Sequence, residues 1–195
     1  MSKRAFDLAT SLCGLLLLAP LLGAIALWIC LDSPGPVLFR QLRIGRHGVP
    51  FSIFKFRTMT ARPDGPQLTV GQDARVTRAG RFLRHYKLDE LPQLINVLQG
   101  TMSLVGPRPE VPRYVACYSP EMRRIVLSVA PGITDWASIH YKDENAILGR
   151  ASDPEQAYIE TILPAKLEYY AQYVRERSFW TDLRIIASTL TAIVR

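Results

Sequence analysis

The sequence predicts an α+β chain that is mostly helical, begins with a membrane helix and carries one small β-hairpin. From Ala5 to Leu31 the only charged residue is Asp7, and this stretch of about 27 residues exceeds the roughly 20 that a bilayer core requires. Two neighbouring runs, 37–44 and 50–59, are rich in β-branched and aromatic residues with rough alternation. Much of the remaining chain places apolar residues three or four positions apart, which is typical of amphipathic helices.

Pro20 complicates the N-terminal helix, because a proline inside a helix removes a hydrogen bond and clashes with the preceding turn. Three interpretations are open. The segment is a secretory signal peptide, with "AIA" at 24–26 as a cleavage-like site, a straight crossing, or a re-entrant helix that bends at Pro20 and leaves on the side it entered. Lys3 and Arg4 precede the segment and the basic block 40–46 follows it, so the positive-inside rule favours the re-entrant helix.

The turn "DSPGP" at 32–36 ends the membrane segment, and the hairpin follows with Gly45 and Gly48 in its turn. Residues 61–73 are predicted to be a loop. Residues 75–100 predict two short helices, the second with an apolar face and with Pro92 in its first turn.

The proline- and glycine-rich segment 100–112 leaves little room for regular structure. A helix is predicted from about Pro120 until 131–132, and a long helix over 154–177 interrupted at Pro164. The last helix, 178–195, either packs in the core or lies in the membrane interface.

Positive charge dominates the middle of the chain. The 195 residues contain 24 Lys and Arg against 17 Asp and Glu, a net charge of +7. Eleven of the basic residues lie between Arg40 and Lys87, where only Asp64 and Asp73 oppose them, so this segment alone carries +9. The expected partner is anionic: a phosphate-bearing substrate, nucleic acid or an acidic membrane surface. The three cysteines match neither a disulfide framework nor a zinc site, which indicates a reducing compartment.

Asp89 and Glu90 are the leading candidates for chemistry. Taken alone, the pair is typical of a helix N-terminus, with Asp89 as cap and Glu90 in the first turn. Beside the most basic segment of the chain, however, an ionised carboxylate can also act as a nucleophile or as a ligand of Mg²⁺. Both interpretations are open on the sequence.

Three basic residues are candidate phosphate ligands. Arg108 lies between Pro107 and Pro109, which either form a rigid surface turn or restrict the backbone that presents the guanidinium to a phosphate. Lys55 and Arg57 share one face of a predicted strand, which is either a simple exposed face or part of the site. The three histidines lack metal-ligand spacing and are treated as structural, and no Walker or Rossmann phosphate loop is present.

Four segments carry a resemblance to a known family. They are "KRAFDLATSL", "GPVLFRQLRIGRHGVPFSIFKFRTM", "DARVTRAGRFLRHYKLDELPQLINVLQGTMSLVGPRPE" and "PGITDWASIHY". Together they make the chain resemble, over nearly its whole length, the bacterial sugar transferase family of small monotopic phosphoglycosyl transferases that act on polyprenol phosphate.

The resemblance implies transfer of a sugar-1-phosphate from a UDP-sugar to undecaprenyl phosphate with release of UMP, the first membrane step of glycoconjugate assembly. It implies that Asp89 attacks phosphorus and forms a covalent phosphosugar intermediate, with Glu90 as its partner and Mg²⁺ at Asp89. It also implies that Arg84 binds phosphate. The segment 107–109 would contribute to the nucleotide site, and Lys55 and Arg57 match the family's "KFRTM" positions.

The resemblance further implies one monotopic catalytic domain over 1–195. Residues 1–34 would be a re-entrant helix bent at Pro20, and 35–195 a cytoplasmic part with C-terminal amphipathic interfacial helices. The active site would face the cytoplasm at the bacterial inner membrane, in contact with anionic lipid of the inner leaflet, with no nucleic acid partner and a possible homo-oligomer. Without the extra membrane helices of larger relatives, the chain resembles a minimal catalytic form.

Several positions depart from the family's pattern. Thr101 stands where Asp is frequent, Ala19 replaces the serine before the bend proline, and four residues after Pro131 differ: Asp135, Ser138, His140 and Tyr141. These last changes leave the sugar unidentified. The alternative function is a non-catalytic, membrane-tethered binder of anionic lipid or nucleic acid, whose binding would weaken with salt.

Overall fold

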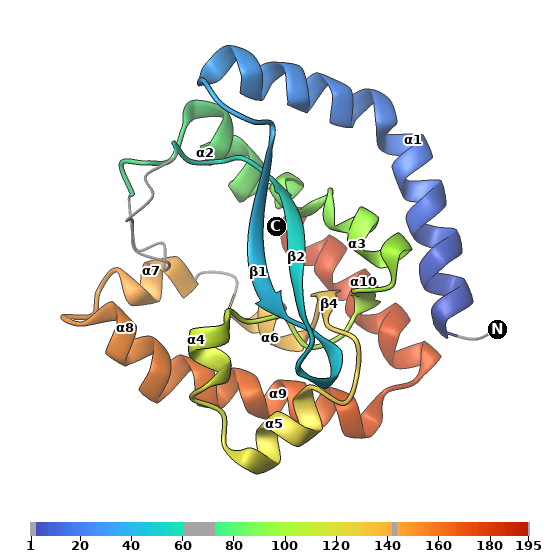
Figure 1. Ribbon diagram of the computed structural model, residues 1–195, viewed down its shortest axis with the longest axis vertical. Helices are drawn as coiled ribbons and strands as arrows, with labels where there is room; N and C mark the ends of the chain where they lie inside the picture. The colour runs from blue at the N-terminus through green and yellow to red at the C-terminus, as the bar shows by residue number, and fades with distance from the viewer. Residues whose placement is uncertain (1–2, 61–72, 142–143, 195) are drawn as a thin grey trace.

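The computed structural model describes residues 3–60, 73–141 and 144–194, and all but the last residue of the predicted loop 61–73 lies outside these ranges. Within them, helices surround two two-stranded sheets. One sheet is the hairpin of β1 and β2, which crosses the middle of the molecule (Figure 1). The predicted mostly helical α+β class is therefore confirmed.

Helix α1, Lys3–Asp32, is a single helical element with Pro20 in its interior. It is long enough and apolar enough to cross a membrane by length and composition. Leucines such as Leu16, Leu17 and Leu31 are exposed along it. Exposed apolar surface of this size is typical of a site that contacts a membrane or another protein.

The first two turns of α1 are fixed to the rest of the chain by polar contacts. The Arg4 guanidinium donates to the carbonyl oxygens of Val97 (2.6 Å) and Leu98 (3.1 Å), at the C-terminal end of α3, Gln93–Gln99. The buried Asp7 carboxylate accepts hydrogen bonds from the Ser103 hydroxyl (2.7 Å) and the Leu104 N–H (3.3 Å). The one charge inside the apolar segment is thus a buried anchor.

The other end of α1 is fixed to the same body. Arg57, which is buried, donates to the carbonyl oxygens of Ser33 (2.6 Å) and Pro34 (2.7 Å) and satisfies acceptors that follow the last helical turn. The Asp32 carboxylate accepts the Ala79 N–H (3.0 Å) of α2, Arg78–His85. Both ends of α1 are therefore bonded to the same folded body, while the leucines between them stay exposed.

The predicted hairpin is confirmed. Strands β1, Leu38–Ile44, and β2, Pro50–Phe56, pair antiparallel. The turn between them contains the short 3-10 helix Arg46–Gly48, with positive φ at His47 (59°) and Gly48 (78°). Glycine tolerates that conformation without strain, as the sequence indicated.

The two predicted helices after the hairpin are α2 and α3, but a separate 3-10 turn, Leu88–Glu90, lies between them. The second helix begins later than predicted, with Pro92 as its N-cap rather than in its first turn. Helix α2 packs closely on the end of the hairpin: a Cβ at Gly80 would lie 2.0 Å from the Thr58 carbonyl oxygen, so only glycine fits there.

The prediction that 100–112 holds no regular structure is wrong in part. Strand β3, Ser103–Val105, pairs parallel with β4, Gly132–Thr134. Gly132 and the residue after β3, Gly106, approach so closely that a Cβ at Gly132 would lie 2.1 Å from the Gly106 nitrogen. Strands of three residues with a distant partner leave no periodicity for a sequence analysis to detect.

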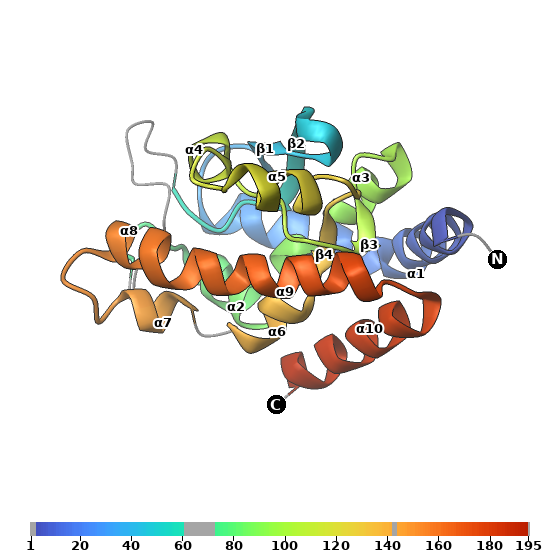
Figure 2. The same cartoon turned by 90° about the horizontal axis from the view of Figure 1, so that it is seen from below.

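The remaining helices can be followed in Figure 2. They are α4 Pro112–Val115, α5 Pro120–Val126, α6 Trp136–His140, α7 Glu144–Leu148, α8 Pro154–Ala157, α9 Leu163–Glu176 and α10 Phe179–Val194. Helix α5 ends before the predicted stop at 131–132. The predicted interruption of the helix 154–177 near Pro164 is confirmed: the π-helical turn Tyr158–Ile162 separates α8 from α9. Pro164 lies in the first turn of α9, where proline is well tolerated.

Helix α10 has two apolar sides. Ile185 is fully buried, as expected of a core helix, whereas Phe179, Trp180 and Leu190 are exposed. The core alternative is confirmed for the first side, and contact of the second side with a membrane interface stays a prediction.

Candidate active site

Asp89 and Glu90 lie in the 3-10 turn Leu88–Glu90 and not at a helix cap. Neither the N-cap of this turn, Lys87, nor that of α3, Pro92, makes a side-chain capping bond. The cap interpretation of Asp89 is therefore wrong. Lys87 has a left-handed backbone (φ 55°), a conformation that non-glycine residues rarely adopt and that recurs at functional sites.

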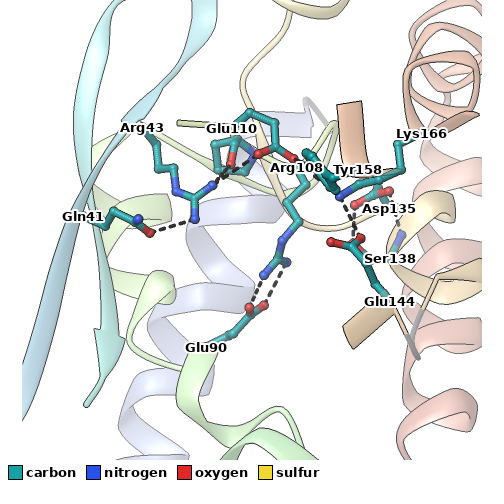
Figure 3. A network of polar contacts seen from close by, with 11 residues as sticks. Gln41, Arg43, Glu90, Arg108, Glu110, Asp135, Ser138, Glu144, Tyr158 and Lys166 are labelled. Atoms are coloured by element: carbon teal, nitrogen blue, oxygen red, sulfur yellow. Dashed lines mark hydrogen bonds and ion pairs between the residues drawn. The ribbon is translucent and has the colours of Figure 1, made fainter. Parts of the chain in front are cut away.

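Glu90 is saturated with charged hydrogen bonds. Lys55 on β2 donates to Oε1 (2.8 Å). The Arg108 guanidinium donates to both carboxylate oxygens, with Nη1 at 3.0 Å from Oε2 (Figure 3). Although burial acts to raise it, the pKa of Glu90 is held well below its usual range by Arg108 and Lys55. Glu90 is thus an ionised carboxylate with both oxygens already engaged.

Asp89 is the opposite case. Its side chain is buried, with only 7% of the residue exposed, yet no described residue donates a hydrogen bond to its carboxylate. Burial first, and the neighbouring Glu90 second, raise the pKa of Asp89, against the opposing charges of Lys55, Arg84 and Lys87. A desolvated carboxylate beside cations is available to a partner from outside the chain.

The segment that presents Arg108 is fixed on both sides. The Gly132 N–H donates to the Pro107 carbonyl oxygen (3.0 Å), and the Arg43 guanidinium donates to the Pro109 carbonyl oxygen (3.0 Å). Pro107, Arg108 and Pro109 also line a pocket of about 10 Å³, just enough to hold one water molecule.

A second buried charge cluster lies behind this segment. Glu110 accepts hydrogen bonds from the Tyr158 hydroxyl (2.6 Å) and Lys166 Nζ (3.4 Å), and Arg43 lies 3.5 Å from its other oxygen (Figure 3). Lys166 also contacts Glu144 (3.1 Å). Although burial acts to raise it, Lys166 and Arg43 lower the pKa of Glu110. Sequence reasoning missed this cluster; its one signal was a lysine within the apolar pattern of 154–177.

Two of the departures noted in the sequence compensate each other. Asp135 is the N-cap of α6 and accepts the Ser138 N–H (3.0 Å) and the Ser138 hydroxyl (2.6 Å) on separate oxygens. Burial raises the pKa of Asp135, while the bonds from Ser138 lower it. His140 stacks on Tyr169 with 4.8 Å between ring centroids, in line with a structural histidine.

The predicted site residues divide into two groups. Lys55, Glu90 and Arg108 are joined by hydrogen bonds, and Arg84, on the last turn of α2, is close enough to act on the charge of Asp89. Arg57 is not brought into this group: β2 ends at Phe56, and the Arg57 guanidinium lies on the carbonyl groups after α1.

Asp89 is a buried carboxylate that accepts no hydrogen bond from the described residues and lies within the electrostatic reach of Lys55, Arg84 and Lys87. Such an arrangement of cations suits an anionic group such as a phosphate. The family comparison agrees: residues 1–195 match the family model described as bacterial sugar transferase, and the chain belongs to that family.

The chain is similar to several proteins with named activities, including the following three. The chain is 41% identical over 192 residues to UDP-glucose:undecaprenyl-phosphate glucose-1-phosphate transferase of Escherichia coli (strain K12), covering 96% of this chain and 39% of that protein. It is 43% identical over 198 residues to undecaprenyl-phosphate glucose phosphotransferase of Komagataeibacter xylinus, covering 97% and 35%. It is 39% identical over 198 residues to UDP-glucose:undecaprenyl-phosphate glucose-1-phosphate transferase of Caulobacter vibrioides (strain ATCC 19089 / CIP 103742 / CB 15), covering 100% and 70%. The chain therefore spans little more than a third of two of these relatives.

Proposed function

We propose that this chain transfers a sugar-1-phosphate from a UDP-sugar to undecaprenyl phosphate and releases UMP, through a covalent intermediate on Asp89. The carrying observation is the contrast within the dyad: Glu90 has both oxygens bonded, whereas Asp89 is buried and receives no hydrogen bond from the described residues. The substrates are proposed from the names of the relatives.

The reaction is written in two displacements. An Asp89 oxygen attacks the sugar-bearing phosphorus of the donor, and the bond from this phosphorus to the bridging oxygen of the diphosphate breaks, so that UMP departs with that oxygen. A phosphate oxygen of the lipid then attacks the same phosphorus. The bond to Asp89 breaks, which yields a lipid diphosphate sugar and restores the carboxylate.

The surrounding cations offset the charge of two anions that must meet. Arg84, Lys55 and Arg108 supply positive charge near Asp89, and the planar guanidinium of Arg108 suits two oxygens of one phosphate. Glu90 acts as a positioning residue for Lys55 and Arg108. It is not a proton acceptor in this proposal, because its lowered pKa keeps it ionised and both oxygens are engaged.

Magnesium fits the site with Asp89 as its protein ligand. Mg²⁺ is commonly held by one or two carboxylates together with substrate phosphates. The described residues contain no group of three or more His, Cys, Asp or Glu that could hold a metal, and Glu90 has no unengaged oxygen, so the donor diphosphate would complete the coordination. The ion would supply charge neutralisation at that diphosphate.

The contacts at the two ends of α1 support a re-entrant helix. A straight helix of 30 residues is about 45 Å long, and a crossing would place its ends on opposite sides of a bilayer. Arg4 and Asp7 at one end, and Asp32 and Arg57 at the other, contact a single folded body. In this proposal Arg57 therefore secures the end of α1, and the dyad lies at the cytoplasmic surface of the inner membrane.

The test is release of UMP from a panel of UDP-sugars with Mg²⁺ and undecaprenyl phosphate, comparing the wild type with Asp89→Asn. Release by the wild type alone, together with a phosphosugar adduct on the Asp89 peptide when the lipid is omitted, is expected. Equal release by Asp89→Asn would exclude Asp89 as nucleophile. A wild type that is silent with every donor, and whose lipid binding collapses with salt, would favour a non-catalytic binder.

A further inference from the structure

The outer face of α2 combines exposed aromatic rings with exposed positive charge. On the inner face of α2, Ala79 and Leu83 are buried in one hydrophobic cluster with Ile25 and Ile29 of α1. One helical turn apart on the outer face, Phe82 and Tyr86 are exposed, with 4.8 Å between their ring centroids. Basic residues flank these rings and are also exposed: Arg78, Arg81, His85 and Lys87.

This face continues the apolar surface of α1. The Trp28 ring lies 5.4 Å from the Phe82 ring, and Trp28 is itself exposed. Leu27 and Leu31, in the same last turns of α1, are more exposed still. Aromatic side chains with a polar edge concentrate where hydrocarbon meets headgroups, and cations there contact phosphate. An apolar chain lying along α1 would therefore meet these rings next.

The other end of the face reaches the dyad. Lys87 ends the link between α2 and the 3-10 turn, two residues before Asp89, and is held in the left-handed conformation (φ 55°). This conformation is strained for lysine, and strained backbone of this kind is common at functional sites. Its charge acts on the Asp89 carboxyl, against the larger effect of burial.

The cations on the hairpin side of the dyad are more covered than those on the α2 side. There Lys55 and Arg108 are already bonded to Glu90 and are largely covered, with 17% and 28% of their side chains exposed. On the α2 side, Lys87 and Arg81 are exposed. Exposed cations on that side are free to meet an anionic headgroup, whereas those on the hairpin side are already paired.

We propose that the outer face of α2 is the docking site of the lipid acceptor, with the isoprenoid chain of a polyprenyl phosphate along Trp28, Phe82 and Tyr86 and its phosphate at Lys87. This inference rests on the proposed function and deepens it. It assigns the acceptor and the donor to different sides of Asp89, so the two half-reactions respond to different residues.

The experiment separates the half-reactions with purified full chain in nanodiscs. Donor alone gives a burst of UMP equal to the enzyme, and added undecaprenyl phosphate gives steady turnover. For the double variant Phe82→Ser/Tyr86→Ser, the burst is expected to keep its wild-type size while KM for undecaprenyl phosphate rises about tenfold. Lys87→Gln is expected to raise the same KM by a similar factor.

Chain length distinguishes the two parts of the site. With a polyprenyl phosphate of two isoprene units, Lys87→Gln keeps its effect on KM, whereas the aromatic double variant loses most of its effect. Leu42→Ser is the matched apolar control, since Leu42 is exposed and alternates away from Phe39, the cross-strand partner of Lys55. Arg124→Gln on α5 is the matched control for charge; both controls keep wild-type kinetics.

Four outcomes overturn the inference. An unchanged KM in both α2 variants means that the acceptor docks elsewhere. A burst that falls with turnover means that the face serves the donor. Loss of flotation with vesicles that contain no acceptor means that it contacts bulk phospholipid. A wild type that gives no UMP burst overturns the proposed function itself. In the other three outcomes the wild type does give a burst, so the two kinds of failure can be told apart.

Discussion

Two buried charge clusters lie on either side of the segment 107–109, and they differ in whether the chain itself supplies a hydrogen-bond donor to every carboxylate. Around Glu110, the carboxylate is met by Tyr158, Lys166 and Arg43, all supplied by the chain itself. Around the dyad, Glu90 is satisfied in the same way but Asp89 is left without a donor among the described residues. A closed cluster stabilises a shape, whereas a buried carboxylate left open keeps a desolvation cost that an incoming partner can relieve.

Asp89→Asn should break this contrast most strongly. Loss of the nucleophile is expected to lower UMP release at least about a thousandfold. The carboxylate of Asp89 is a buried charge that receives no hydrogen bond from the described residues, and the amide of asparagine is neutral. The free energy of unfolding should therefore stay equal or rise. Enzyme assay and urea denaturation of the same preparation measure both. An inactive variant that is also strongly destabilised would show that Asp89 has a structural partner after all.

Arg108→Lys tests the bond between Glu90 and the segment 107–109. A lysine cannot bond both carboxylate oxygens in one plane, so kcat/KM for the donor is expected to fall about a hundredfold with a small change in stability. The matched control is Arg113→Lys, whose ion pair with Glu155 lies on the surface with 61% of the Arg113 side chain exposed. That control should keep its activity, because exposed pairs contribute little. Equal rates for Arg108→Lys and the control would show that Arg108 has no role in the reaction of the donor.

Glu110→Gln addresses the closed cluster, and its larger effect should be on stability. Removing one charge of a buried network leaves Lys166 and Arg43 undercompensated, so the free energy of unfolding should fall by about 3 kcal/mol. The donor kcat/KM should fall only a few-fold, through a looser segment 107–109. Tyr158→Phe, which deletes the hydrogen bond to Glu110 and the one from Lys166, should cost about 1–2 kcal/mol. Activity lost as deeply as in Arg108→Lys, without loss of stability, would make this cluster part of the reaction.

The sequence predicts local structure well here and non-local pairing poorly. The hairpin, α2, α3 and α10 follow from periodicity within single segments. Strands β3 and β4 were missed because each has three residues and pairs with a distant partner. Asp89 and Glu90 are adjacent carboxylates whose roles the sequence left open. What separates them is Lys55 and Arg108, which come 35 residues before and 18 residues after Glu90.

The smallest predicted effect is a shift along the pH axis, and it sharpens the same contrast. The pKa of Asp89 is raised above its ordinary 3.8, mainly by burial, and the attacking form is the carboxylate. Donor kcat/KM should therefore be full above that raised pKa and fall as the pH drops through it, with an acid limb above the usual aspartate range.

Stability should follow a different course on acidification. The pKa values of Glu90 and Glu110 are held below the ordinary 4.5 by their cations, so the stability they contribute is present above 4.5 and is lost only as the pH falls towards the lowered values. Asp89 has the opposite sign: protonation in the raised window adds stability while it removes activity. A pH profile of single-turnover UMP release beside one of the unfolding free energy should thus show activity falling first. If both fell together, Asp89 would belong with the closed cluster.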